Sequence, residues 1–167
     1  ILSGSNSSVH SKGAPEIPKS LDVTGKKHLI LGICYGMQLL AHKLGGQIDR
    51  PYKHREYGPS LVTLDTKHPL FVGVAKKTEV WASHGDIVNS APNGFTVIAQ
   101  SENVIEAIED KEHKLYGVQF HPEVTDTEDD NLILKNFVTD ICGCEMDWEA
   151  SDVIKNIQSE VLEIVGS

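Results

Sequence analysis

The pattern of hydrophobic and polar positions opens with a short apolar run that is followed by a helical period. Residues His28–Ile33 form a run with the length of a buried strand. After a turn, apolar side chains recur at positions i, i+3, i+4 and i+7, namely Met37, Leu40, Ala41 and Leu44. This spacing predicts an amphipathic helix that ends at Gly45-Gly46.

Further apolar runs predict five strands and two more helices. The strands are expected at Leu61–Leu64, Glu79–Ala82, Phe95–Gln100, Val104–Ile108 and Leu115–Phe120. Thr127 is the expected N-cap of a helix with an apolar face of Ile133, Leu134, Phe137, Val138 and Ile141. Ser151 begins the last helix, which has a stripe of Ile154, Ile157, Val161 and Ile164. Strands mixed with helices predict an α/β fold, with one mixed central sheet flanked by helices.

Composition narrows the classes of function. A chain of 167 residues, 40% hydrophobic and 23% charged, is about one domain with a substantial core. A net charge of −9 without a basic stripe argues against nucleic acid as a partner. No apolar stretch approaches the roughly 18 residues of a membrane helix, so no membrane partner is expected. Three cysteines, an odd number, favour a reduced and therefore cytoplasmic setting.

The strongest chemical signal is the segment Gly32-Ile33-Cys34-Tyr35-Gly36, a nucleophile elbow with cysteine in place of serine. The two flanking glycines remove side chains that would clash in a tight turn. The N-terminus of the following helix favours the thiolate form of Cys34, and the Tyr35 N–H can help to bind an oxyanion. A buried small hydrophobic residue is the alternative interpretation, but the glycine pair favours the nucleophile.

A thiolate needs a base, and His121 is the best candidate among eight histidines. It lies at the end of a predicted strand, and Glu123 can accept a hydrogen bond from its imidazole. Pro122 stiffens the link between the two. A surface turn is the alternative for this tripeptide alone, but with Cys34 it gives the hypothesis of a Cys–His–Glu triad. We predict no metal, because no His, Cys and Asp cluster has the spacing of a metal site.

These motifs resemble the class I (triad) glutamine amidotransferases, and among them the GMP synthase branch. The resemblance rests on Gly32–Gln38 and Gln119–Glu123, and it extends to Arg55–Gly58, Trp81–Asp86 and residues 133–142. It covers essentially residues 1–165. It implies a flavodoxin-like fold whose first strands lie upstream of Ile1. It also implies that Cys34 attacks the amide of glutamine and that His121, held by Glu123, protonates the departing ammonia.

The resemblance also implies roles for residues around the nucleophile. The backbone N–H groups of Tyr35 and Ser5 would form the oxyanion hole. The residues expected to bind glutamine are Gly36, Gln38, Tyr57, Gly58, Ser83, His84 and Asp86. For Ser83–Asp86, a loop between strands is the alternative interpretation.

The loop after the first residues departs from the family pattern. The family sequence is usually Ser-Gly-Gly-Pro, whereas this chain has Ser3-Gly4-Ser5-Asn6. A serine would be strained there if the position requires a positive φ. A weak or inactive glutaminase is therefore an alternative outcome.

The acidic tail suggests a boundary. Residues 145–167 contain six acidic side chains and one lysine. By resemblance, residues 1–144 are an amidotransferase domain, and residues 145–167 are a linker and the first helix of an ATP-pyrophosphatase (synthetase) domain. That domain would use ATP and Mg²⁺ to aminate XMP to GMP, would receive the apolar stripe of the tail helix, and could mediate a dimer. No cofactor is expected within this chain. The alternatives are the glutaminase of another class I amidotransferase and a non-catalytic module of the same fold.

Overall fold

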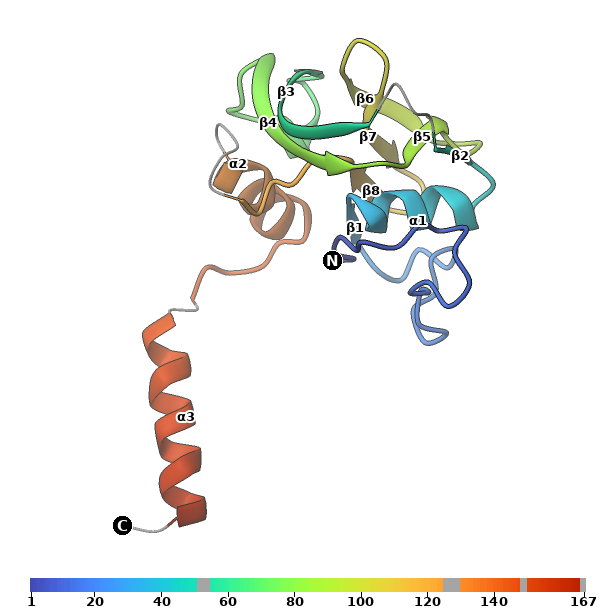
Figure 1. Ribbon diagram of the computed structural model, residues 1–167. Helices are drawn as coiled ribbons and strands as arrows, with labels where there is room; N and C mark the ends of the chain where they lie inside the picture. The colour runs from blue at the N-terminus through green and yellow to red at the C-terminus, as the bar shows by residue number, and fades with distance from the viewer. Residues whose placement is uncertain (51–54, 125–129, 148–149, 166–167) are drawn as a thin grey trace.

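A six-stranded sheet forms the centre of the computed structural model, which describes residues 1–50, 55–124, 130–147 and 150–165 (Figure 1). Its strands, in spatial order, are β1 (Ile30–Ile33), β8 (Leu115–Val118), β7 (Ile105–Asp110), β6 (Thr96–Gln100), β3 (Glu56–Leu64) and β4 (Lys77–His84). β1 and β8 are parallel, and the other neighbours are antiparallel. A separate antiparallel pair joins β2 (Gln47–Asp49) to β5 (Ile87–Ser90).

This architecture confirms the predicted α/β class with a mixed sheet, and it corrects three details. β2 and β5 were missed, so the described strands form two sheets rather than one. β3 begins at Glu56, five residues before the predicted Leu61. The prediction began too late because the first half of the strand is largely exposed and has no apolar pattern. β4 extends to His84, so Ser83 and His84 are strand residues and not part of a loop.

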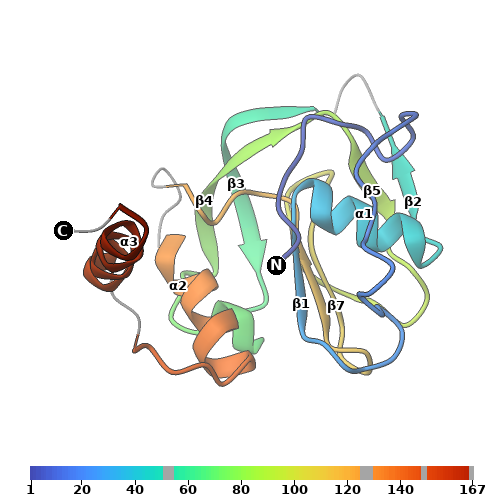
Figure 2. The same ribbon diagram turned by 90° about the horizontal axis from the view of Figure 1, so that it is seen from below.

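Helices cover both faces of the central sheet (Figure 2). On one face, Met37 and Ala41 of α1 (Tyr35–Lys43) pack with Ile48, Val88 and Ile108. On the other face lie η1 (Pro69–Phe71), α2 (Asp130–Lys135) and the π-helical η2 (Asn136–Ile141). There Phe71, Ile133 and Phe137 join Leu31 and Val118 in the largest apolar cluster. The expected cap Thr127 lies outside the described residues.

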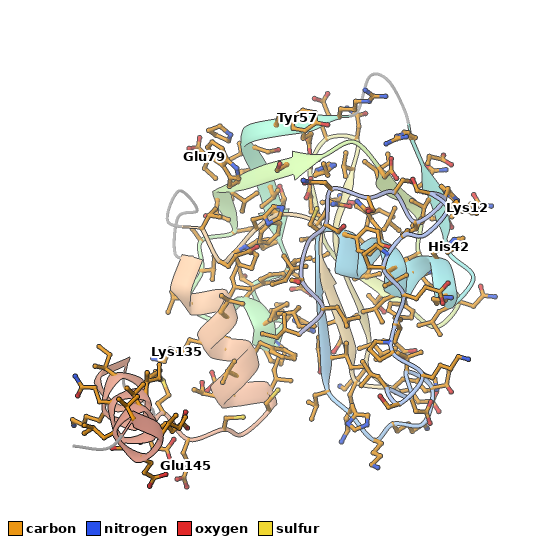
Figure 3. The ribbon with its side chains drawn as sticks, turned by 60° about the horizontal axis from the view of Figure 1, so that its bottom comes forward. Lys12, His42, Tyr57, Glu79, Lys135 and Glu145 are labelled. Atoms are coloured by element: carbon orange, nitrogen blue, oxygen red, sulfur yellow. The ribbon has the colours of Figure 1, made fainter. Side chains whose placement is uncertain are left out.

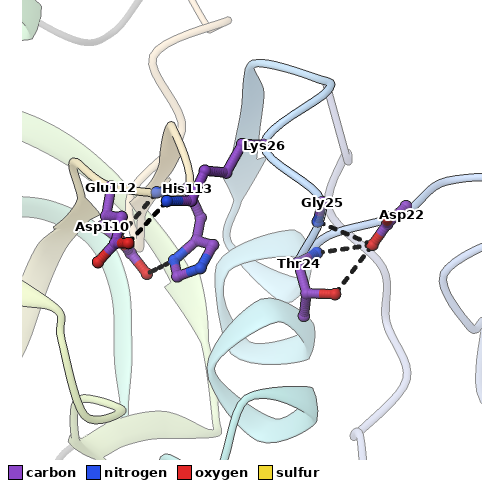
Figure 4. Close-up of polar contacts among 7 residues, drawn as sticks. All are labelled: Asp22, Thr24, Gly25, Lys26, Asp110, Glu112 and His113. Carbon is purple, nitrogen blue, oxygen red and sulfur yellow. Dashed lines mark hydrogen bonds and ion pairs between the residues drawn. The ribbon is translucent and has the colours of Figure 1, made fainter.

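The segments before β1 are fixed to the sheet by backbone and polar contacts. Leu2 forms a parallel bridge with Gly32, on the side of β1 opposite β8. In the loop before β1, the Asp22 carboxylate accepts hydrogen bonds from the backbone N–H groups of Thr24 and Gly25 (Figure 4). Lys26 then pairs with Glu112 of the β7–β8 turn at 2.6 Å. The Lys26–Glu112 pair thus connects this loop to the β7–β8 turn at the surface.

The last helix, α3 (Ala150–Val165), extends away from the rest of the molecule (Figure 1). Its predicted stripe is exposed, with Ile154, Ile157, Val161 and Ile164 between 50% and 84% accessible. An amphipathic helix with this much uncovered apolar surface is typical of a segment that packs on a partner. In the described part of the chain, no helix combines the length and the hydropathy that crossing a membrane would require.

Candidate active site

Cys34 occupies a strained turn between β1 and α1. Its backbone has φ 51° and ψ −106°, a conformation that costs a non-glycine residue free energy and is concentrated at functional sites. The Cys34 N–H donates to the Val118 carbonyl at 2.8 Å, which ties the turn to β8. The side chain is only 4% exposed, and its Sγ lies 3.7 Å from the Ser83 carbonyl oxygen. We call residues 32–36 the cysteine elbow.

The backbone of neighbouring segments lies so close to Gly32 and Gly36 of the cysteine elbow that only glycine fits at these two positions. A Cβ on Gly32 would lie 2.5 Å from the Gly36 carbonyl carbon, where no side chain fits. A Cβ on Gly36 would collide with the Leu2 carbonyl group. Removing both Cβ atoms lets α1 start immediately above β1 and aim its N-terminus at the thiol.

His121 and Glu123 lie beside the cysteine elbow, just beyond β8. The Nδ1 atom of the His121 imidazole is 2.7 Å from Glu123 Oε1. The backbone N–H of His121 donates to the backbone carbonyl of Trp81. A hydrogen bond with Cys34, together with the one to Glu123, raises the pKa of His121 to about 10. Burial acts most strongly on Glu123 and opposes its ionisation, but the hydrogen bond and the charge of His121, together with a backbone hydrogen bond, lower the pKa of Glu123 overall. The electrostatics therefore favour an imidazolium that is hydrogen-bonded to an anionic Glu123.

Two adjoining hollows meet at Cys34 and together form a groove. One, of about 410 Å³, is lined by Ser3, Gly4, Ser5, Asn6, Cys34, Ser83, His121 and Glu123. The other, of about 160 Å³, is lined by Ser5, Asn6, Ser7, Cys34, Gln38, Arg50, Tyr57, Ser83, His84, Gly85 and Asp86. The thiol thus has the His–Glu pair on one side and a polar pocket on the other.

Five of the residues expected to bind glutamine line the smaller hollow: Gln38, Tyr57, Ser83, His84 and Asp86. The Gln38 amide donates to the Asp86 carbonyl at 2.8 Å, which fixes the turn after β4. Tyr57 is exposed at the outer end of β3 (Figure 3).

The remaining two expected residues, Gly36 and Gly58, are not among the lining residues. Gly36 is packed against Leu2. Gly58 has φ 106°, so it bends β3 in a way that requires glycine.

The structure corrects the expected strain at Ser5. The non-glycine residues with positive φ in the described part of the chain are Lys26, Cys34 and Lys114. Ser5 therefore needs no glycine-like conformation, and its hydroxyl accepts a hydrogen bond from the Ser7 N–H at 3.1 Å. The Ser3–Asn6 loop forms a wall of both hollows without a backbone penalty at this position.

Sequence reasoning missed two features of the site. Arg50, just after the unpredicted strand β2, places its Nε 3.0 Å from Asp86 Oδ1 in the smaller hollow. Glu56, His84 and Glu106 form a buried cluster whose ligand-type atoms lie within 4.8 Å of one another. No motif links them because they come from three strands. A glutamate within the apolar run Ile105–Ile108 was the available signal.

The comparisons with known proteins establish the family. Residues 1–141 match the family Glutamine amidotransferase class-I. The chain therefore belongs to the class I glutamine amidotransferases.

The curated relatives are more specific. The chain is 45% identical over 166 residues to the glutamine-hydrolyzing GMP synthase of Thermomicrobium roseum, covering 99% of this chain and 31% of that protein. It is 46% identical over 171 residues to the protein of the same name from Thermosipho melanesiensis, covering 100% of this chain and 32% of that protein. The chain thus spans about a third of the length of these relatives.

Solved structures agree with this assignment. A protein from Thermoplasma acidophilum, proposed to be one of the subunits of a GMP synthase, aligns with a TM-score of 0.63 and 31% identity, over 77% of this chain and 60% of that one. A glutamine amidotransferase from Thermotoga maritima aligns with a TM-score of 0.52 and 24% identity, over 82% and 62% of the two chains. The second likeness concerns the fold alone. Together they confirm the predicted amidotransferase fold.

Proposed function

We propose that this chain is the glutaminase part of a GMP synthase and that Cys34, His121 and Glu123 are its catalytic triad. The observation that carries the proposal is the placement of a strained, buried cysteine beside an imidazole that is hydrogen-bonded to a glutamate. A cysteine activated by a base, with a third group orienting the base, is the arrangement of nucleophilic acyl transfer.

The reaction follows from this arrangement. The Cys34 thiolate attacks the side-chain amide carbon of glutamine, and the backbone N–H groups of Tyr35 and Ser5 stabilise the oxyanion. The C–N bond breaks as the His121 imidazolium donates its proton to the amide nitrogen, which leaves as ammonia, and a thioester remains on Cys34. His121 then takes a proton from water, the hydroxide attacks the thioester, and glutamate leaves as the C–S bond breaks.

The polar hollow suits a zwitterionic amino acid. Asp86 is buried, and Arg50 pairs with its carboxyl group and brings a positive charge to the same wall. We assign Asp86 to the α-ammonium group of glutamine and Arg50 to its α-carboxylate, with Gln38 holding the Asp86 backbone. Tyr57, Ser83 and His84 close the hollow around the side chain.

The ammonia is delivered, in this proposal, to an ATP-pyrophosphatase domain that uses ATP and Mg²⁺ to aminate XMP in the cytoplasm. Two observations support such a partner: the curated relatives are about three times as long, and α3 presents an uncovered apolar stripe. We assign that stripe to docking on this domain, through which a dimer could also form.

Glutamate release from glutamine tests the proposal. The full chain is assayed alone and with the synthetase domain of the Thermomicrobium roseum relative, with and without XMP and ATP. We expect Cys34→Ala to abolish release and Cys144→Ala, at an exposed cysteine, to leave it intact. XMP and ATP should stimulate release in the two-component mixture, and Ile157→Ser in the stripe should weaken that stimulation.

The other outcomes identify the alternatives. Cys34-dependent release that no XMP-aminating partner stimulates indicates the glutaminase of another class I amidotransferase. A folded chain without release in any mixture indicates a non-catalytic module, for which the unusual Ser5-Asn6 sequence is the supporting observation.

A further inference from the structure

The strands β3 and β4 form an antiparallel ribbon that carries one wall of the smaller, polar hollow. The outer end of this ribbon lies far from the point where β3 pairs with β6. β3 pairs with β6 at Thr63 and Leu64. At the opposite end of β3, Glu56 pairs with His84 of β4, next to the lining residues Tyr57 and Ser83. Figure 1 shows this ribbon curling over the rest of the sheet. The outer end therefore needs other contacts to stay in place.

Glu106 of β7 reaches the outer end of the ribbon from the central sheet. Its side chain is fully buried, and its carboxylate lies with the Glu56 carboxylate and the His84 imidazole in one cluster. The His84 Nε2 is 3.2 Å from Glu56 Oε2. The Glu106 carbonyl accepts the N–H of Gln119, two residues before His121. The cluster thus connects the pocket wall to the strand that leads to the candidate base.

The charges of this cluster do not balance if both carboxyl groups are ionised. The buried Glu106 carboxylate and the half-buried Glu56 carboxylate would repel each other, and neither oxygen of Glu106 has a hydrogen-bond donor. One proton removes the repulsion and gives one Glu106 oxygen a partner, because a neutral carboxyl group donates to a neighbouring carboxylate. Glu56 is the member that keeps its charge, since its side chain is 24% exposed and faces the His84 imidazole.

We propose that Glu106 is a positioning residue of the glutaminase site: as a neutral acid it donates a hydrogen bond to Glu56, which in turn holds His84 and the β4 wall. The role in turnover rests on the function proposed above, whereas the protonation state does not. The consequence is a pocket whose wall loosens when Glu106 loses its proton.

The surroundings of Glu106 determine that its carboxyl group loses its proton near neutral pH. Burial, followed by the charge of Glu56, raises the pKa of Glu106 to about 8. The nearby Ser101 hydroxyl acts in the opposite direction, with the smallest effect. The hydrogen bond with His84 outweighs the burial of Glu56 and lowers the pKa of that carboxyl group. The groups facing Glu106 are thus Glu56 from β3, His84 from β4 and Ser101 before β7.

Infrared spectroscopy of the full chain tests the protonation state without any need for activity. We expect the carbonyl band of a neutral carboxylic acid at pH 6.5, fading as the pH passes about 8. The band should be absent from Glu106→Gln and retained in Glu102→Gln, an exposed control with the same change of charge. Absence of the band from the unmodified chain overturns the proposal. So does a stoichiometric Zn²⁺ or Mn²⁺ ion that a chelator removes, since a metal would keep both carboxylates ionised.

Labelling of Cys34 tests the positioning role. A glutamine analogue with a diazoketone in place of the amide needs the pocket, whereas iodoacetamide needs only the thiol, and mass spectrometry quantifies each at Cys34. We expect Glu106→Ala to slow labelling by the analogue about tenfold and to leave labelling by iodoacetamide unchanged. The amide of Glu106→Gln still donates to Glu56, so the analogue should label this variant as fast as the unmodified chain. The labelling rate of the unmodified chain should decline above about pH 8, whereas that of Glu106→Gln should not.

The outcomes separate the two proposals. Equal slowing of both reagents in Glu106→Ala, or no slowing of either, contradicts the positioning role. If Glu106→Ala does not fold, the pH profile of Glu106→Gln decides, and a decline like that of the unmodified chain is then the contradicting result. If the analogue fails to label Cys34 in the unmodified chain, the glutaminase proposal fails, while the infrared result still decides the state of Glu106.

Discussion

The cysteine elbow and the outer end of the β3–β4 ribbon face the same groove, but different kinds of contact hold them. The elbow consists of five consecutive residues, fixed by backbone hydrogen bonds to β8 and by glycines that allow close approach. The ribbon end meets the Glu106 side chain of β7, and the Gln38 side chain of α1 bonds the turn just after β4. Cys34 is therefore positioned by backbone contacts around a short sequence motif, and the pocket wall by side-chain contacts between distant segments.

The largest expected effect comes from removing the base without disturbing the elbow. His121→Ala should lower kcat of glutamine hydrolysis by about 10³-fold or more, because both proton transfers lose their carrier. Steady-state glutamate release measures this, with His42→Ala on the exposed face of α1 as the control. A loss of less than tenfold would assign the proton transfers to another group.

The elbow itself should be the region least tolerant of an added methyl group. Gly36→Ala drives a Cβ into the Leu2 carbonyl, and we expect it to destabilise the fold by about 3 kcal/mol. Gly85→Ala at the ribbon end is the matched change, since its Cβ would meet only the Tyr57 hydroxyl, at 3.3 Å. Thermal unfolding followed by circular dichroism compares them. Equal losses would mean that the elbow is no more tightly fixed than the ribbon.

A smaller effect should distinguish the ribbon by its dependence on pH. The pKa of Glu106 is raised from 4.5 to about 8, so the folded chain keeps a proton that the unfolded chain releases. Stability from this group is complete below about pH 4.5 and is lost as the pH rises through about 8. Relative to Glu106→Gln, the unmodified chain should lose about 1–2 kcal/mol between pH 6 and pH 8. Urea unfolding at each pH measures the difference, and parallel profiles would refute it.

Prediction from sequence succeeded where neighbouring residues carry the signal. The apolar run of β1, the glycine pair around Cys34 and the helical period of α1 lie within about one turn of one another, and all three were found. It failed at β2, a three-residue strand, and at the first half of β3, which faces solvent and lacks an apolar pattern. A period can be recognised only where burial selects side chains at regular intervals.

The sequence by itself determined the tight turn around Cys34, because it depends on consecutive residues, the fold class, through the pattern of apolar runs, and the family, through its resemblance to known motifs. It also placed His121 and Glu123 together, since only Pro122 separates them. Only the tertiary structure decided that Ser5 is unstrained, that Arg50 faces Asp86, and that Glu56, His84 and Glu106 meet. The physical reason is that sheet register and strand order bring these groups together, and register is a property of pairing between distant segments.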